Sequence, residues 1–189
     1  MPRAGLTHER VVAEAAAVAD EVGLERLTLA AIAQRFGVTL PSLYKHVDGL
    51  DAVKRDLAVL GVRELTAALS AAAVGKAGPD ALHAIANAYR GYARAHPGRA
   101  AAAVRAPDPG DAEHLAAGEA AATVLAAVLD GYDIASENTI DAIRSLRAVM
   151  HGFVTLEAAG GFGLPRSVDA TYTRLIDGLD AVFATWAKQ

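Results

Sequence analysis

The spacing of apolar residues along the chain is helical almost throughout. Between residues 8 and 22 apolar side chains recur at steps of three and four, and Thr7 stands where a helix N-cap is expected. Gly23 and Gly37 then interrupt the pattern at a short interval. The pattern therefore predicts three short helices near the start, over residues 8–22, over a segment capped by Thr28 that ends at 36, and over 41–47.

After residue 50 the predicted helices become longer, and loops rich in Gly and Pro separate them. They cover residues 50–74, 82–95, 99–105, 111–130, 137–159 and 167–187. Asp111 and Ser136 are the expected N-caps of the two helices that follow them. The change in helix length predicts two domains, residues 1–47 and residues 48–189.

The last predicted helix has the clearest periodicity of the chain. Its apolar residues recur at steps of three and four over nearly five turns: Tyr172, Leu175, Ile176, Leu179, Val182, Phe183 and Trp186. Such a stripe fits an ordinary core face, and it also fits a surface that partly meets a second copy of the chain. The stripe alone leaves both alternatives open.

Composition supports a fold made of helices alone. Alanine runs at 15–17, 71–73, 100–103 and 120–122 suit helices better than sheets, and Val, Ile and Thr never gather into alternating runs. The prediction is an all-α protein. Cysteine is absent, no uncharged apolar stretch reaches a membrane span, and no signal peptide is recognisable, so we expect a cytoplasmic protein.

Catalytic motifs are missing from the sequence. There is no nucleophile elbow, no Gly-rich phosphate loop and no zinc-binding His-Glu-x-x-His. The six histidines, at positions 8, 46, 83, 96, 114 and 151, never stand three or four residues apart. We therefore expect no enzyme, no metal and no cofactor.

Residues 28–47 have the composition of a helix-turn-helix. Two short helices flank a turn at Gly37, each preceded by a threonine in a capping position, and small alanines allow the helices to approach closely. Leu43 and Val47 are expected to face inward. The outward face of the second helix then carries hydroxyl, ammonium and imidazole groups suited to phosphates and base edges: Thr39, Ser42, Tyr44, Lys45 and His46. Arg3 and Arg10 are further candidates for phosphate contacts.

This stretch resembles the TetR/AcrR family of transcriptional regulators. The resemblance extends from Thr7 to about Leu57, and its spacing is carried by Thr28, Ile32, Ala33, Gly37, Val38, Thr39, Leu43, Tyr44, His46 and Val47. The resemblance implies an N-terminal three-helix helix-turn-helix domain followed by a larger helical ligand-binding and dimerisation domain. It also implies binding to double-stranded DNA at a pseudo-palindromic operator.

The resemblance further implies which residues contact DNA. The positions that hold the DNA backbone in the family are matched by Thr28, Thr39, Tyr44 and His46, and those that face base edges by Leu40, Pro41, Ser42 and Lys45. The chain departs from the family pattern at Pro41, where glycine is frequent, and at Leu50, where a phosphate-binding lysine is frequent. Lys54 and Arg55 are the candidates to compensate for that lysine.

The C-terminal part is similar to a subgroup whose regulatory domain bears a Trp-His-Gly signature, with methionine in place of the tryptophan. The resemblance implies a ligand cavity lined by Tyr89, Tyr92, His96, Met150, His151 and Phe153, although each of these also fits an ordinary core position. It implies a homodimer through the last two long helices, at Ala148, Gly152, Leu175, Leu179, Val182, Phe183 and Trp186. A mostly apolar cavity would suit a lipophilic or aromatic effector.

These observations predict a ligand-responsive, sequence-specific DNA-binding regulator, most simply a repressor that a small-molecule effector releases. The alternative is a helical small-molecule-binding protein or an enzyme, in which a helical corner only imitates a helix-turn-helix. Sequence-specific binding to DNA distinguishes the two.

Overall fold

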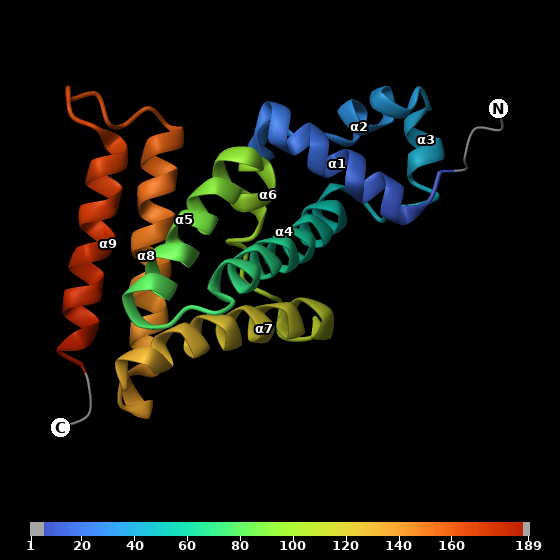
Figure 1. Cartoon of the computed structure of the whole chain (residues 1–189). Helices are drawn as coiled ribbons and strands as arrows, with labels where there is room; N and C mark the ends of the chain where they lie inside the picture. The colour runs from blue at the N-terminus through green and yellow to red at the C-terminus, as the bar shows by residue number, and fades with distance from the viewer. Residues whose placement is uncertain (1–5, 187–189) are drawn as a thin grey trace. The chain divides into compact units, whose positions relative to one another are not determined.

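The computed structural model describes residues 6–186 and contains no β-strand in that part of the chain. The all-α prediction is therefore confirmed. Along the described residues nine α-helices follow one another (Figure 1): α1 His8–Val22, α2 Leu29–Phe36, α3 Leu40–Leu43, α4 Leu50–Ala73, α5 Gly78–Ala95, α6 Pro97–Ala102, α7 Ala112–Leu129, α8 Thr139–Ala158 and α9 Val168–Ala184.

The helices divide into two compact units. Unit 1 contains the chain up to Arg63 together with Ala95–Ala117, and unit 2 contains Glu64–Arg94 together with the chain from Gly118 onward. Helices α4 and α7 contribute residues to both units. The functional boundary at residue 47 stays a prediction, since compactness groups the first half of α4 and the α6 region with the N-terminal helices.

The core of unit 1 joins α1, α2, α3 and the start of α4. Ile32 of α2, Leu43 of α3 and Leu57 of α4 are fully buried in one apolar cluster with Val11 and Ala15 of α1. Helices α1 and α2 begin at capping threonines, where the backbone N–H of Arg10 donates to Thr7 and that of Ala31 to Thr28. Caps and core together fix the helices that surround the Gly37 turn.

Helix α6 is bound to α1 at very close range. A Cβ at Gly98 would lie 2.2 Å from the backbone carbon of Ala19, so only glycine fits at this crossing. Asp20 of α1 accepts the backbone N–H groups of Gly98 and Arg99, at 2.9 and 3.0 Å, and the Nε–H of Arg99 at 2.8 Å. One aspartate therefore satisfies the open N-terminus of α6 and joins residues almost 80 positions apart.

The core of unit 2 is built largely by α5, α8 and α9. Tyr172 and Phe183 of α9 are fully buried with Leu146 and Met150 of α8 and Ile85 of α5. The Tyr172 hydroxyl donates to the Ala86 carbonyl at 2.7 Å, which satisfies its polar end inside the core. Figure 1 shows α8 and α9 lying side by side within this unit.

Four local predictions are corrected by the structure. The third helix is shorter than predicted and continues as turns through His46. Thr39 precedes that helix, but its hydroxyl contacts Ser42 Oγ at 3.1 Å and makes no capping hydrogen bond. Ser136 begins a 3-10 turn, and α8 starts only at Thr139, so Ser136 does not occupy the N-cap position of α8. Its hydroxyl donates to the Glu137 carboxylate. The last helix ends at Ala184, and the predicted end at 187 lies outside the described residues.

One helical segment, Ala112–Tyr132, is long and apolar enough to cross a membrane by length and composition. Its mean hydropathy over the best window is 1.3, and 28% of that window is buried. Core helices of soluble proteins meet the same criterion.

Candidate nucleic-acid interface and regulatory groups

The turn between α2 and α3 depends on one glycine. Gly37 has a φ of 65°, in the left-handed region, and its N–H bonds to Gln34 while the Val38 N–H bonds back to the Ala33 carbonyl, each at 3.0 Å. These two hydrogen bonds close the end of α2, and the chain then turns into α3. Ile32 and Leu43, both fully buried, then join the two helices.

The segment 39–47, which we call the recognition segment, separates polar from apolar side chains as predicted. Leu43 and Val47 are buried, whereas Tyr44 is 57% exposed and Lys45 is exposed beside it. Thr39, Leu40 and Pro41 are also exposed, and Ser42 and His46 are half-buried. The structure therefore brings the predicted DNA-contacting residues of this segment onto one accessible surface of unit 1.

The hydroxyl groups of this surface already have partners that limit their rotation. Thr28 Oγ1 accepts the Ala31 N–H at 3.1 Å, so its own proton remains available for a phosphate oxygen. Thr39 and Ser42 contact each other through their hydroxyl oxygens. A phosphate or a base edge would therefore meet oriented hydroxyls. Arg10 lies 5.7 Å from the Phe36 ring, and Arg3 lies outside the described residues.

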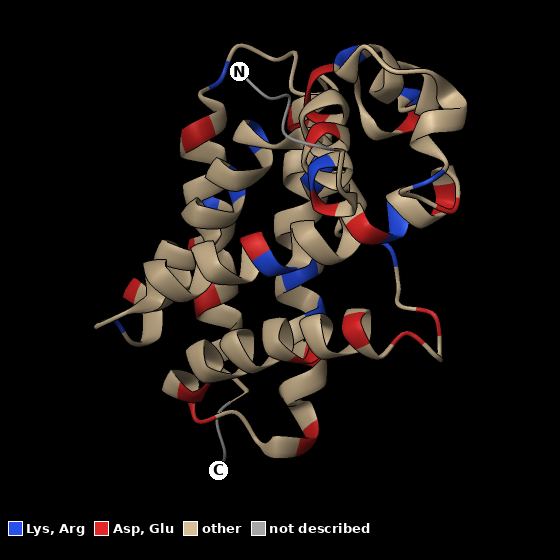
Figure 2. Cartoon of the chain, turned by 90° about the vertical axis from the view of Figure 1, so that its right-hand side faces the viewer, with Lys and Arg blue, Asp and Glu red and all other residues tan. Residues whose placement is uncertain are grey.

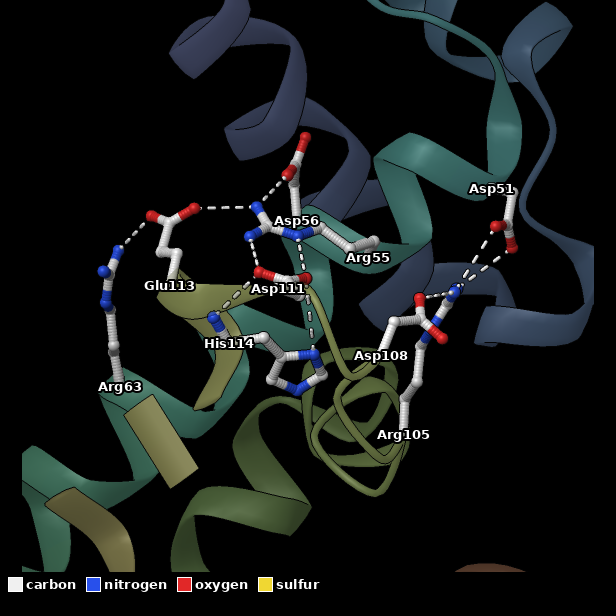
Figure 3. A network of polar contacts seen from close by, with 9 residues as sticks. All are labelled: Asp51, Arg55, Asp56, Arg63, Arg105, Asp108, Asp111, Glu113 and His114. Atoms are coloured by element: carbon white, nitrogen blue, oxygen red, sulfur yellow. Dashed lines mark hydrogen bonds and ion pairs between the residues drawn. The ribbon is translucent and has the colours of Figure 1, made fainter. Parts of the chain in front are cut away.

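Arg55 does not compensate for the missing lysine at position 50. Its guanidinium bonds to Asp111 through two nitrogens, to Asp56 at 2.8 Å and to Glu113 at 2.7 Å (Figure 3). Four of the five N–H groups of Arg55 are thus engaged by carboxylates, which also balance its charge, so Arg55 is poorly suited to bind a phosphate. Lys54, which is half-buried, remains the candidate.

The polar network around Arg55 joins three segments of unit 1, namely α4, the loop before α7 and the first turn of α7 (Figure 3). The guanidinium of Arg55 holds the pKa of Asp111 well below its usual range, and Asp111 also accepts the His114 N–H at 3.0 Å. Arg63 extends the network by donating to Glu113 at 2.9 Å. The sequence did not indicate this network, because Asp111 and Glu113 lie 56 and 58 positions from Arg55.

Acidic and basic residues are mixed along the helices rather than grouped into blocks of one sign. Figure 2 shows acidic and basic residues interspersed along the helices, in keeping with the net charge of −4. Such a distribution provides no broad positive field, so any affinity for DNA depends on the local surface around the recognition segment.

The residues predicted to line a ligand cavity do not all come together. Met150 and Phe153 lie in the core of unit 2, and the Tyr89 hydroxyl contacts His151 Nδ1 at 3.4 Å. The Tyr92 hydroxyl donates to Glu64 at 3.0 Å. His96 instead belongs to unit 1, where its Nδ1 lies 3.4 Å from Asp20. These in-chain partners favour the alternative of ordinary core positions.

Unit 2 has a cavity of about 280 Å³ elsewhere, between the end of α4 and the end of α7. Its lining is mostly small and apolar, and includes Ala73, Val74, Val124, Val128 and Gly131, with Lys76 and Ser70 as the polar groups. The volume is at the lower end of what drug-sized ligands occupy. None of the six predicted lining residues belongs to it.

A buried arginine is the main polar feature of the unit 2 core. Arg90, 7% exposed, lies 4.9 Å from the Tyr172 ring and 5.4 Å from the Phe153 ring, and its Nε donates to Glu157 at 2.9 Å. Arg94 donates to the same carboxylate at 2.8 Å. Because these guanidinium groups stabilise the anion, the pKa of Glu157 is lowered to about 2.

The predicted dimer residues fall into two groups. Leu175 and Val182 of α9 are 37% and 44% exposed, and Ala148 and Gly152 of α8 are exposed as well. Leu179 and Phe183 are buried in the core of their own chain, and Trp186 packs against that core. The periodic stripe therefore contains two adjacent faces, and only one of them is available to a partner.

Three exposed apolar side chains near the same helices were not predicted. Ile140 at the start of α8 is 60% exposed, Leu156 near its end is 54% exposed, and Leu164 before α9 is 83% exposed. Ile140 and Leu156 lie at opposite ends of α8, so these are separate exposed side chains rather than one patch. They are recognised only by the exposed fractions of their side chains, which the sequence alone does not give.

The fold and the exposed recognition segment define a helix-turn-helix regulator, and comparison with known proteins agrees. Residues 82–179 match the family described as tetracyclin repressor-like, C-terminal domain. The chain is 36% identical over 174 residues to the uncharacterized HTH-type transcriptional regulator Rv0681 of Mycobacterium tuberculosis, covering 92% of this chain and 79% of that protein. It is 35% identical to the uncharacterized HTH-type transcriptional regulator YobS of Bacillus subtilis, covering 85% and 84%.

A solved structure shows the same fold. TetR-Q116A from Acinetobacter baumannii AYE, in complex with minocycline, superposes with a TM-score of 0.74 at 22% identity over 98% of this chain and all of that one. The chain belongs to the TetR family of transcriptional regulators. It is accordingly a DNA-binding regulator, and its relatives belong to a class of proteins that are not enzymes.

Proposed function

We propose that the chain is a homodimeric, effector-responsive repressor whose recognition segment contacts a pseudo-palindromic operator. The observation that carries this proposal is the surface of residues 39–47. Tyr44 and Lys45 are exposed there while Leu43 and Val47 hold the segment to the core. Tyr44, His46, Thr28 and Thr39 would contact the DNA backbone, and Leu40, Pro41, Ser42 and Lys45 would contact base edges.

A second copy of the chain is the proposed occupant of the exposed apolar face on α8 and α9. Leu175 and Val182 are separated by seven residues, so they lie on one side of α9. Ala148 and Gly152 are four residues apart on α8, where their small side chains allow a partner helix to approach closely. A two-fold dimer would hold two recognition segments about 34–36 Å apart or more, as two half-sites require.

The effector is proposed to be a lipophilic or aromatic small molecule bound in the regulatory part of the chain. Binding would favour a conformation in which the two recognition segments are wrongly spaced for the operator, and the operator affinity would fall accordingly. Tyr89, Tyr92, Met150, His151 and Phe153 are the proposed contacts. Their burial means that the chain must open locally to admit a ligand.

A regulator of bacterial type that binds DNA directly would act in the cytoplasm, and we propose that location for this chain. We also propose that it functions without crossing a membrane, because the whole apolar segment Ala112–Tyr132 lies within residues 82–179, which match the family's C-terminal domain.

The DNA-binding proposal is tested by a gel shift with DNA that flanks the chain's own gene. We expect retardation that depends on sequence and weakens steeply as salt rises, because phosphate contacts release counterions. A duplex of scrambled sequence serves as the control. Equal retardation of both duplexes, or no retardation of any native fragment, would contradict the proposal.

A further inference from the structure

His8, in the first turn of α1, contacts a hydrogen-bond acceptor with each of its ring nitrogens. Nδ1 lies 3.0 Å from the backbone carbonyl oxygen of His46, and Nε2 lies 3.1 Å from Asp56 Oδ2. The carbonyl belongs to the recognition segment and the carboxylate to α4. One side chain therefore joins three segments of unit 1 that lie far apart in the sequence.

The protonation state of the ring decides whether both contacts are hydrogen bonds. A neutral imidazole carries one N–H, so it can donate to either the His46 carbonyl or the Asp56 carboxylate, and its other nitrogen then faces an acceptor with a lone pair. The imidazolium carries two N–H groups and donates to both. Histidine changes between these states in the physiological pH range.

The contact on the far side of the ring is held in place by the Arg55 network. Asp56 accepts from Arg55 at 2.8 Å, and Arg55 is bound in turn to Asp111 and Glu113 (Figure 3). Asp56 is also largely covered, with 16% of its side chain exposed. The Asp56 carboxylate, which contacts Nε2, is therefore held in a fixed position. When the His8 ring donates to both Asp56 and the His46 carbonyl, it ties that carbonyl to the fixed carboxylate.

The charges that face His8 come from each of the elements around it. Glu9 is its neighbour on α1, and α4 supplies Asp56, Arg55 and Arg63. Glu113 of α7 lines the same cleft, and the recognition segment brings the His46 ring and carbonyl. Both arginines are engaged with acids, Arg55 with three and Arg63 with Glu113, so the nearest charge to the ring is the Asp56 carboxylate.

We propose that His8 is a positioning residue for operator binding, and that its doubly protonated ring holds the end of the recognition segment against α4. Specific DNA affinity is then higher near pH 6 than near pH 8. The inference rests on the proposed DNA-binding function and adds a pH-dependent element to it. His8 needs no contact with DNA for this role.

The test measures dissociation constants for an operator duplex and a scrambled duplex by fluorescence anisotropy, at constant ionic strength, from about pH 5.5 to pH 8.5. The dissociation constant for the scrambled duplex divided by that for the operator measures specificity. This ratio removes protonation effects common to all DNA, such as those of the His46 ring. In the wild type we expect this ratio to fall about fivefold between pH 6 and pH 8, the worth of one hydrogen bond. His8→Gln should have the low ratio that the wild type reaches near pH 8, and this ratio should not change with pH.

Two further variants separate positioning from general effects. Asp56→Asn removes the carboxylate that accepts from Nε2, so it should flatten the pH dependence as His8→Gln does. His83→Gln is the matched control, because His83 Nε2 makes a comparable 2.9 Å contact with Asp177 in unit 2. This control should keep the wild-type slope. If the ratio of dissociation constants depends on pH in the same way in wild type, His8→Gln and Asp56→Asn, the inference is overturned.

A measurement without DNA distinguishes failure of this inference from failure of the proposed function. Hydrogen exchange of a peptide covering residues 44–48, corrected for the intrinsic pH dependence, should be faster near pH 8 than near pH 6 in the wild type and alike at both in His8→Gln. Equal protection in the wild type at both pH values would overturn the positioning role. Loss of specific DNA binding at every pH, with exchange as expected, would instead overturn the DNA-binding proposal and retain the pH-dependent contact.

Discussion

Each unit contains an arginine that stabilises it from within, and the two arginines do so in different ways. Arg55 of unit 1 has 25% of its side chain exposed and bonds to acids from α4, the loop before α7 and α7 itself. Arg90 of unit 2 has 8% exposed, and lies against two aromatic rings as well as bonding to Glu157. Both guanidinium groups make several hydrogen bonds to carboxylates, but only Arg90 is buried in an apolar core and shielded from water.

The difference assigns the two networks different tasks. A buried charge that loses its partner is costly, so Arg90 and Glu157 depend on each other for the stability of unit 2. A partly exposed network loses less when one member is removed, because water replaces the missing partner. The Arg55 network therefore contributes less to the free energy of unfolding than the buried Arg90–Glu157 pair does.

The largest expected effect comes from breaking the buried pair. Arg90→Met should lower the free energy of unfolding by about 3 kcal/mol, because Glu157 loses its main partner and the aromatic rings lose a stacked cation. Urea denaturation measures the change. Arg94→Met is the matched control, since Arg94 contacts the same carboxylate but is 55% exposed, and its loss should cost less than about 1 kcal/mol. Equal losses in the two variants would contradict the comparison.

The next effect concerns the exposed face of α9. Val182→Glu should weaken self-association by at least about 2 kcal/mol, because the proposed two-fold interface would bury a carboxylate without a partner. Light scattering across a dilution series measures the mass, and circular dichroism verifies the helices. Thr173→Glu, also exposed on α9, is the control and should leave the mass unchanged.

Phe183→Glu sharpens the same distinction between faces. Because Phe183 is fully buried in its own chain, this substitution should unfold unit 2 rather than release folded monomers. Thermal scans monitored by circular dichroism separate these outcomes. A folded monomeric Phe183→Glu variant would place this residue at the interface after all.

Substitutions in the recognition segment should have smaller, selective effects. Lys45→Ala should cost about 1–3 kcal/mol and change the preference among operator variants, as a base contact does. Tyr44→Phe should cost about 1 kcal/mol on every variant alike, because only a backbone contact is lost. Competition binding with single-base operator variants measures both. Uniform loss for Lys45→Ala would show that this lysine contacts phosphate only.

A separate prediction concerns the pH dependence of stability from Glu157. Its pKa is lowered from 4.5 to about 2 in the folded chain, so folding is favoured while the carboxylate is ionised. That contribution is complete above about pH 4.5 and disappears as the pH falls toward 2. Urea midpoints at about pH 7, 4.5 and 3 should fall less steeply for Glu157→Gln than for wild type. Identical slopes would show that other carboxylates, such as Asp111, account for the acid sensitivity.

Local signals in the sequence were sufficient for most of the fold. The helix over residues 8–22 and the end of α2 were predicted at their observed limits, because Thr7, Gly23 and Gly37 mark them through contacts within a few residues. The separation of Tyr44 and Lys45 from Leu43 and Val47 was also predictable, since it follows from helical periodicity. Ser136 misled the prediction because residues 136–138 form a 3-10 turn, so that Asn138 and not Ser136 directly precedes α8.

Features that depend on the tertiary arrangement were beyond the reach of the sequence. Arg55 appeared free to contact phosphate, because its partners Asp111 and Glu113 lie 56 and 58 positions away. Phe183 and Val182 appeared equivalent within one apolar stripe, although one faces the core and the other does not. A periodic stripe gives the direction of the apolar faces but not which of them the chain itself covers.

The most direct test of the account is photochemical crosslinking to operator DNA in which bromodeoxyuridine replaces thymidine. The account predicts that mass spectrometry will find the crosslinked nucleotide on the peptide that contains Tyr44, and that scrambled DNA in excess will not compete for it. Crosslinks found only on peptides outside residues 28–47, on specific DNA, would contradict the assignment of the recognition segment.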